Sequence, residues 1–307
     1  MKCKICEKEC SSLKSLHAHL SKNHDCSQSD YYHSYYPRYD MSGNGELITY
    51  KNYQHYHQSD FNSRSSFSDW LSKNYSSPQV EEYCASKVKE RMTKKMITTL
   101  PSHFELKSLF LPSCYGFEKI YGSTERFEKA MKVHGINLKY DYSIEPRFQE
   151  GLMKVYIDTR EQAPLYFDNS EKMKLAVGDY SPSENFYSDV YIDRKSLPDL
   201  AGTLAAGRAR VEREIQLAKN LGFYLIFVIE DSYESIRNYS NSNSFSSKMN
   251  GDHIFHEIRD LMSQYDNIQF VTTGTRTAAR RVIENIFRLK GQAKILDLEF
   301  LKDKGIL

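Results

Sequence analysis

Residues 178–199 constrain this chain more than any other stretch, because they combine a strand pattern with charged groups at regular positions. Their sequence is GDYSPSENFYSDVYIDRKSLPD. The apolar Val190 and Ile192 alternate with polar residues, which predicts a strand. Side chains two residues apart on a strand point to the same face of the sheet. Asp193 and Lys195 are therefore expected to share one face.

A second acid lies shortly before this strand. Asp179 ends the run MKLAVGDY, which could form the neighbouring strand of a hairpin. Two carboxylates and a lysine would then share one patch, and carboxylate oxygens suit Mg²⁺ or Mn²⁺. Such an ion lowers the pKa of its bound water and stabilises charge on a phosphate, while a nearby lysine can hold the attacking water. From spacing alone, a solvated hairpin with ordinary charges explains the pattern equally well.

The flanking segments add further parts to this pattern. The run LMKVYIDTREQAPL precedes it, and SLPDLAGTLAAGRARVEREIQLAKN and FYLIFVIE follow it. The span Met153–Glu230 resembles the nuclease domain of the XPF family of structure-specific DNA endonucleases, whose pattern is V-D-x-R-E, G-D-Y, E-R-K-x3-D and a helix with G-R. The matching residues are Asp158, Arg160, Glu161, Gly178, Asp179, Tyr180, Arg194, Lys195, Asp199, Gly207 and Arg208. The chain departs from the family pattern at Asp193, where the family has Glu, so its carboxylate is set back by about one bond length.

The resemblance implies a role for each of these residues. Asp179 and Asp193 would hold the divalent ion, and Asp158 would aid metal or water binding. Lys195 would position the nucleophilic water, and Arg194 would neutralise the scissile phosphate. Supporting roles fall on four residues: Arg160 and Glu161 as an ion pair, Asp199 as a helix cap or as a partner that orients Arg194, and Arg208. A purely structural role for Arg160, Glu161 and Asp199 fits the sequence equally well.

The same segment predicts the fold class of the C-terminal half. Strands alternate with helical runs up to TRTAARRVIENIFRLK, which indicates an α/β sheet with at least partly parallel strands. The resemblance specifies residues 152–307 as a restriction-endonuclease-like, XPF-type nuclease domain with a mixed central sheet flanked by helices. Two apolar stripes favour a homodimer or a related nuclease-domain partner, although each could pack on its own sheet. Their residues are Ile254, Ile258, Leu261 and Met262, then Val282, Ile283, Ile286 and Leu289.

The N-terminal segment, residues 1–26, has the spacing of a small metal site. Cys3 and Cys6 are followed, at intervals of 12 and four residues, by His19 and His24, which is the spacing of a tetrahedral zinc site. The segment resembles a Cys2His2 zinc finger, and a unit this small would depend on zinc to fold. The alternatives are a disordered Cys/His-rich tail, or ligation by Cys10, His17 or Cys26.

This finger is a poor reader of DNA sequence. Its expected base-reading positions are Ser12, Ser15 and Ala18, none of which makes bidentate contacts to bases. We therefore expect phosphate contacts through Lys14 and Lys22, or contact with a protein, rather than sequence readout.

Residues 27–139 carry weaker signals. Residues 27–79 are rich in Ser, Tyr, His and Asn and predict a poorly ordered linker, whose rings could stack on unpaired bases. Residues 80–139 predict a helical module that is either a DNA-binding accessory or a plain spacer; residues 101–136 loosely resemble a small helical repeat of some homing endonucleases. A basic helix at 80–100 would contact phosphates through Lys87, Arg91, Lys94 and Lys95.

Composition limits the remaining possibilities. A net charge of +2, from 42 basic and 40 acidic residues, requires any DNA contact to come from local patches. No run approaches the ~18 apolar residues of a membrane span, and the cysteine–histidine cluster favours an intracellular setting. The sequence thus predicts a metal-dependent DNA endonuclease that acts on branched or junction DNA, in repair, recombination or genome processing. The rivals are an inactive DNA-binding scaffold with a nuclease fold and a zinc-finger regulator.

Overall fold

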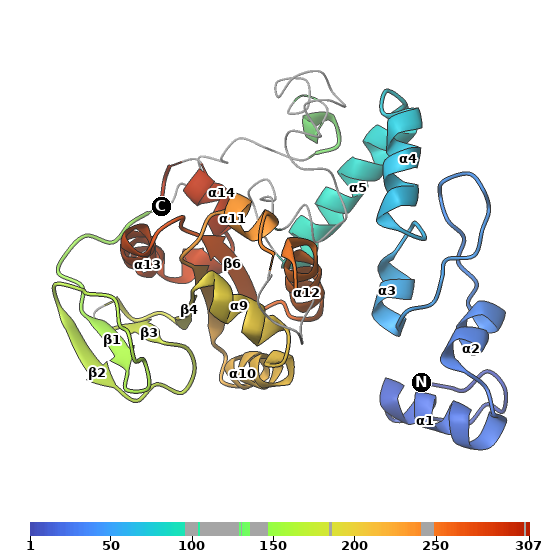
Figure 1. The fold of residues 1–307 in the computed structure, drawn as a ribbon, viewed down its shortest axis with the longest axis horizontal. Coiled ribbons are helices and arrows are strands. Elements are labelled where there is room, and N and C mark those ends of the chain that lie inside the picture. The colour runs from blue at the N-terminus through green and yellow to red at the C-terminus, as the bar shows by residue number, and fades with distance from the viewer. Residues whose placement is uncertain are drawn as a thin grey trace. The chain divides into compact units, whose positions relative to one another are not determined.

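The computed structural model describes residues 1–95, 104, 129, 131–135, 147–183, 186–240, 249–303 and 305–307. The chain divides into two compact units, Met1–Glu81 and Glu82–Leu307 (Figure 1). The boundary falls within helix α5 (Pro78–Lys95), which coincides with the first part of the predicted basic helix. Most of the predicted helical module beyond residue 95 lies outside the described residues.

The first unit contains four further helices. Helix α1 (Leu13–His24) begins after Ser12, whose side chain accepts a hydrogen bond from the Ser15 amide and so caps the helix. It is followed by α2 (Gln28–Tyr35), α3 (Tyr53–Gln58) and α4 (Arg64–Asn74).

The structure differs from the prediction of a poorly ordered linker at residues 27–79. Tyr31, Tyr32 and Tyr56 are buried in one cluster with Leu16 and Leu20 of the N-terminal segment. Large aromatic rings supply the apolar area that the segment lacks in aliphatic residues. The linker prediction relied on the lack of aliphatic periodicity, whereas a tyrosine ring buries as much surface as a large aliphatic side chain.

The second unit is built on one six-stranded mixed sheet in the order β2-β1-β3-β4-β5-β6. Its strands are β1 (Val155–Asp158), β2 (Ser170–Met173), β3 (Tyr180–Pro182), β4 (Val190–Lys195), β5 (Tyr224–Ile229) and β6 (Ile268–Thr272). Strand β3 is antiparallel to both β1 and β4, whereas β4, β5 and β6 run parallel. The predicted mixed sheet is therefore present, with its antiparallel part at the β1-β3-β4 side.

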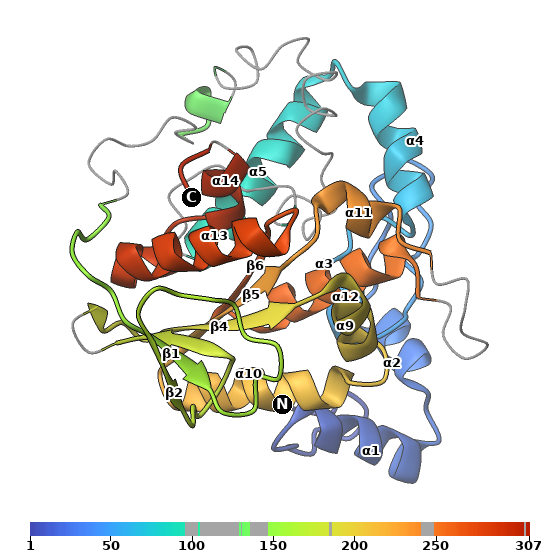
Figure 2. The ribbon, with the colours of Figure 1, turned by 60° about the vertical axis from the view of Figure 1, so that its left-hand side comes forward.

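Parallel strands require crossover connections, and helices provide them here. Helices α9 (Leu197–Leu204) and α10 (Arg208–Asn220) connect β4 to β5; α11 (Tyr233–Arg237) and α12 (Gly251–Gln264) connect β5 to β6. Helix α13 (Arg276–Leu289), the 3-10 helix η3 (Lys290–Lys294) and α14 (Leu298–Asp303) end the chain. Figure 2 shows α10 and α13 on opposite faces of the sheet.

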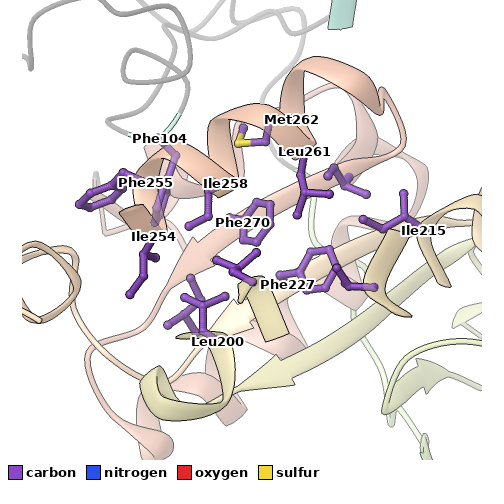
Figure 3. Close-up of a cluster of buried hydrophobic side chains, with 14 of the residues drawn as sticks. Phe104, Leu200, Ile215, Phe227, Ile254, Phe255, Ile258, Leu261, Met262 and Phe270 are labelled. Carbon is purple, nitrogen blue, oxygen red and sulfur yellow. The ribbon is translucent and has the colours of Figure 1, made fainter. Parts of the chain in front are cut away.

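The main core lies between the sheet and one layer of helices. It joins Phe227 and Phe270, whose rings stack at a centroid distance of 4.7 Å, to the buried faces of α9, α10 and α12 (Figure 3). Along β5 all six residues are buried, as expected of a parallel strand covered on both faces. Among the described residues, no helix is long and apolar enough to span a membrane.

Both apolar stripes that favoured a homodimer are buried within this unit. Ile254, Ile258 and Leu261 belong to the core cluster, and Val282, Ile283 and Ile286 are at most 4% exposed. The stripes pack on their own sheet, because α12 and α13 are the layers that cover its two faces. The dimer expectation thereby loses the observation on which it rested.

The turn before β3 depends on Gly178. Its φ of +68° lies in the left-handed region, and an added Cβ would lie 2.6 Å from the carbonyl oxygen of Ile192 on β4. This close approach lets the Asp179 amide donate to the same oxygen at 2.7 Å. The strand that pairs with β4 consequently starts at Tyr180, after Asp179, and not with the run before it as the hairpin prediction had placed it.

We predict that Gly178→Ala destabilises the second unit by about 1–3 kcal/mol, because the new Cβ clashes with backbone and the φ is strained. The control is Gly202→Ala in α9, where a Cβ would meet nothing within 4 Å. That substitution should stabilise by about 0.5–1 kcal/mol through helix propensity. Thermal unfolding of the full chain followed by circular dichroism measures both changes. Equal melting of Gly178→Ala and the wild type would contradict the argument.

Candidate active site

Strand β4 presents an acid and a lysine on one face. The Lys195 ammonium lies 2.5 Å from Asp193 Oδ1, as the alternation of the strand predicted. Burial alone would lower the pKa of Lys195, but the charges of Asp193 and then Asp179 and Glu214 outweigh it and raise that pKa. Lys195 is therefore a fixed cation among carboxylates, able to orient a bound water or an anion.

Asp179 lies beside this pair from the neighbouring turn. Its Oδ2 accepts a hydrogen bond from the Arg194 amide at 2.8 Å. Burial, and then the charge of Asp193, raise the pKa of Asp179 to about 8. A pKa this far above the ordinary value means that the anionic carboxylate lacks compensating positive charge. A bound cation would supply that charge. Carboxylate oxygens such as those of Asp179 and Asp193 are the ligands that a hard divalent ion prefers.

Asp158 is held by hydrogen bonds from the turn after β1 and from Leu175. Its Oδ1 accepts from the Arg160 amide and Nε, both at 2.7 Å, and its Oδ2 accepts from the Leu175 amide at 2.7 Å and from Arg160 Nη2 at 3.1 Å. Burial would raise the pKa of Asp158, but these hydrogen bonds outweigh it and leave that pKa below its ordinary value. With four donors on two oxygens, Asp158 braces the turn after β1, so the predicted metal contact would require it to release some of these donors.

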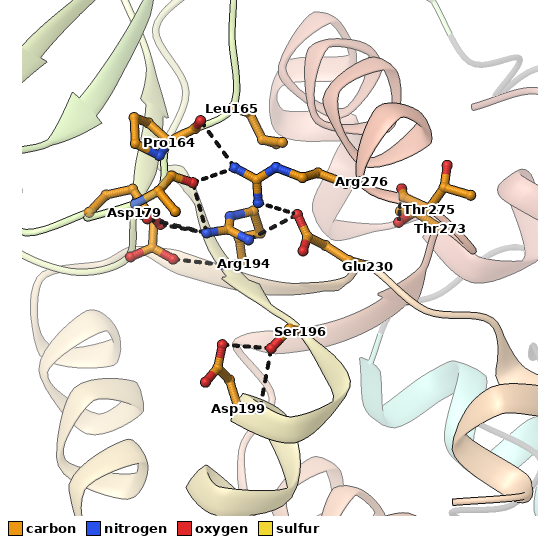
Figure 4. A network of polar contacts seen from close by, with 12 residues as sticks. Pro164, Leu165, Asp179, Arg194, Ser196, Asp199, Glu230, Thr273, Thr275 and Arg276 are labelled. Atoms are coloured by element: carbon orange, nitrogen blue, oxygen red, sulfur yellow. Dashed lines mark hydrogen bonds and ion pairs between the residues drawn. The ribbon is translucent and has the colours of Figure 1, made fainter.

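Arg194 points to the other side of β4 and is held by two acids. Its guanidinium bonds both oxygens of Glu161 at 3.2 Å and Glu230 Oε1 at 2.9 Å. Arg276 of α13 shares Glu230 at 2.8 Å, and both arginines donate to the Ala163 carbonyl (Figure 4). The predicted Arg160–Glu161 pair is replaced by Arg160–Asp158 and Arg194–Glu161. Arg194 is committed to this network, so the predicted phosphate contact would require it to break these pairs.

Glu214, Glu230 and Arg276 are parts of this site that the sequence analysis did not identify. Glu214 of α10 accepts a hydrogen bond from the Gly178 amide at 3.0 Å, directly before Asp179. A signal for Glu214 existed, because it lies three residues after Val211 and four before Ala218, both buried. Helical spacing therefore places Glu214 beside the face of α10 that packs on the sheet.

The two remaining supporting residues are structural. The Ser196 hydroxyl donates to Asp199 at 2.7 Å, and Ser196 is the N-cap of α9, so Asp199 completes the cap, one of its two predicted roles. Arg208 pairs with Glu212, Glu257 and Asp260, which fixes α10 against α12.

In the first unit, the four predicted zinc ligands converge. One ligand atom from each of Cys3, Cys6, His19 and His24 lies within 4.8 Å of all the others. Cys6 Sγ lies 3.2 Å from the Nε2 atoms of both histidines. Tetrahedral zinc holds its sulfur and nitrogen ligands about 3.3–3.8 Å apart, so this donor set fits zinc. Among the described residues, the competing Cys10, His17 and Cys26 do not join this group.

The predicted DNA contacts differ in availability. Lys14 and Lys22 are exposed on α1, and Lys87 is partly covered beside Glu90. Arg91 is 4% exposed and donates to the Met262 carbonyl at 3.1 Å, so it fixes α5 to α12 and does not reach a phosphate. The side chains of Lys94 and Lys95 lie outside what the structure describes.

The fold and these residues define a class: the second unit has an α/β, restriction-endonuclease-like nuclease fold. Residues 157–286 match the ERCC4 domain, and this match supports an XPF-family nuclease domain in that part of the chain. Comparison with curated proteins gave no match.

Two of the solved structures that are similar to part of the chain come from one protein. The first, XPF from Aeropyrum pernix, is 20% identical with a TM-score of 0.33; the match covers 45% of this chain and 66% of that one. The second, the same protein in complex with DNA, is 19% identical with a TM-score of 0.32; the match covers 44% and 64%. The chain thus spans slightly less than two thirds of either relative.

We predict that Asp179→Asn stabilises the second unit at pH 8 without added metal. The folded pKa of Asp179, about 8, lies above its ordinary value, so folding holds a proton and stability falls as pH rises from about 4 to 8. Asparagine removes this slope and should gain on the order of 1–3 kcal/mol at pH 8. Melting temperatures between pH 5 and pH 8 provide the measurement.

Added Mn²⁺ at pH 8 is the companion measurement. It should raise the melting temperature of the wild type and raise that of Asp179→Asn much less, because a bound ion stabilises only the folded state that holds it. Equal Mn²⁺ shifts in the two proteins would remove Asp179 from the metal site.

Proposed function

We propose that the second unit is a divalent-metal-dependent endonuclease that hydrolyses phosphodiester bonds in branched or junction DNA. The observation that carries the proposal is that Asp179 lies beside the Asp193–Lys195 pair of β4, within the segment that matches the ERCC4 domain. The setting would be DNA repair, recombination or genome processing inside the cell.

Each residue of the site has a distinct task in this proposal. Asp179 and Asp193 would hold Mg²⁺ or Mn²⁺, an ion that activates bound water and stabilises charge on the phosphate. Lys195, paired to Asp193, would orient the attacking water. Glu214 would fix the Gly178 amide and thereby the turn that carries Asp179. Glu161 and Arg194 would hold the strand and the following loop in register.

The first unit would act as a zinc-stabilised DNA contact. Zinc on Cys3, Cys6, His19 and His24 would hold α1 against the tyrosine cluster, and the exposed Lys14 and Lys22 would meet phosphates. Lys87, Lys94 and Lys95 of α5 would add to this affinity. Because only lysines contact the backbone in this scheme, binding should be insensitive to sequence and sensitive to salt.

We predict that Asp179→Ala and Lys195→Ala each reduce cleavage of a branched DNA substrate by roughly 10²–10⁴-fold, while DNA affinity changes little. Asp193→Glu should keep or raise activity, since it restores the acid of the family pattern. The control is Lys219→Ala, which removes an exposed pair with Asp266 away from the site. Single-turnover cleavage with Mn²⁺ measures all four variants.

Two outcomes of this experiment would count against the proposal. Wild-type rates for both alanine variants would refute the site. A wild type that binds branched DNA without cutting it would instead favour the inactive DNA-binding scaffold.

We also predict one zinc per chain in the purified protein, lost in Cys6→Ser and in His19→Ala. Because Cys3, Leu16 and Leu20 share a core with the buried tyrosines, zinc loss should also loosen residues 27–58. Hydrogen exchange there reports the loosening, while the matched substitution Cys26→Ser should leave zinc and protection unchanged. A zinc-free wild type with a protected N-terminal unit would contradict this assignment.

A further inference from the structure

The loop between β1 and β2 holds one aromatic ring out into solvent. Tyr166 is 72% exposed, whereas its neighbours Leu165 and Phe167 are both buried. An exposed tyrosine on its own is ordinary. What distinguishes Tyr166 is the set of contacts that fix the loop on either side of it.

Both buried neighbours of Tyr166 are fixed on Tyr180. The Leu165 amide donates to the Tyr180 hydroxyl at 3.0 Å, and the Phe167 ring packs on the Tyr180 ring at a centroid distance of 5.5 Å. Tyr180 directly follows Asp179 in the chain and begins β3. The residues on each side of Tyr166 are thus anchored to the segment that carries an acid of the candidate site.

The beginning of the same loop is anchored by two arginines. Arg194 donates to the Ala163 carbonyl at 3.1 Å, and Arg276 donates to the carbonyls of both Ala163 and Pro164 (Figure 4). Arg194 is the residue between Asp193 and Lys195 on β4. The loop is consequently tied to β4 and α13 through these two side chains, so Tyr166 is held in a fixed place.

A third arginine covers the Tyr166 ring. The Arg280 guanidinium lies 5.5 Å from the ring centroid, one helical turn along α13 from Arg276. Asp168 at 2.7 Å and Glu284 at 3.3 Å hold this guanidinium. Ring and cation are therefore pre-ordered, which reduces the entropy that a ligand must overcome on binding.

We propose that Tyr166 and Arg280 form a binding site for an unpaired nucleobase of the DNA substrate. The base would stack on Tyr166, whose ring Arg280 holds in place from one side. Such stacking is independent of base identity and requires a base that is out of the duplex. This inference rests on the proposed function, and it gives that function a physical reason to prefer junctions over continuous duplex.

The first experiment measures binding of the full chain to DNA in EDTA, so that cleavage plays no part. Tyr166→Ala should weaken binding to a splayed-arm substrate by roughly 5- to 100-fold, while affinity for blunt duplex stays within about twofold. Tyr166→Trp should restore binding, because any large aromatic ring can stack. The control is Tyr187→Ala, which removes another tyrosine of the same unit that is 67% exposed.

A 2-aminopurine placed at the first unpaired position gives a direct readout of stacking. The wild type should quench its fluorescence, and Tyr166→Ala should not. Where the protein cleaves, Tyr166→Ala should raise KM on the splayed substrate and leave kcat unchanged, since the ring binds and does not react.

The outcomes separate this inference from the proposed function. Unchanged affinity and quenching in Tyr166→Ala would overturn the nucleobase site, even in an active nuclease. An equal loss of affinity for blunt duplex would also overturn it, because the ring would then contribute general affinity. A third outcome is possible, in which the wild type does not cleave DNA but Tyr166→Ala still loses splayed-arm affinity and quenching. That outcome would refute the proposed nuclease activity and support the nucleobase site.

Discussion

The guanidinium of Arg194, held between Glu161 and Glu230, is the interaction on which the rest of the nuclease unit depends. It joins the loop after β1, the end of β5 and, through Glu230, the start of α13 to one strand. A buried charge is tolerated only when it is paired and hydrogen-bonded, and removing one partner costs several kcal/mol. Elements far apart in sequence are thus fixed around β4 by charge compensation as well as by apolar packing.

The two faces of β4 treat charge in opposite ways. On the Arg194 side, Glu161 and Glu230 pair with Arg194 and Arg276, so the charges on that face are compensated. On the other side, Asp179, Asp193 and Glu214 surround a single lysine, and burial, followed by the charge of Asp193, raises the pKa of Asp179. An excess of negative charge in a partly buried place destabilises the protein by itself, yet it is what a hard cation requires. The matched charges and the excess of acids therefore lie on opposite faces of one strand.

Several predicted roles changed because a side chain can satisfy only one set of partners. Asp158 matches the family motif, but the Arg160 and Leu175 donors occupy both of its oxygens. Arg91 has the composition of a DNA contact, but its guanidinium bonds a carbonyl of α12. The apolar stripes of α12 and α13 fit a dimer interface equally well until the sheet between them is seen to bury both. Residue type and spacing limit the roles that a side chain can have, whereas the groups that it contacts in the folded protein decide between them.

The sequence alone determined the elements whose physical basis is local. Alternation along residues 190–195 predicted the strand and the shared face of Asp193 and Lys195, and ligand spacing predicted the cysteine–histidine cluster. Tertiary structure decided what depends on contacts between distant segments. It placed Glu214 of α10 next to the turn that carries Asp179 and joined Arg194 to Glu161 and Glu230. It also packed Tyr31, Tyr32 and Tyr56 against the first helix and held Tyr166 outward. No local pattern encodes these pairings, because each forms only when separate elements meet around a common core.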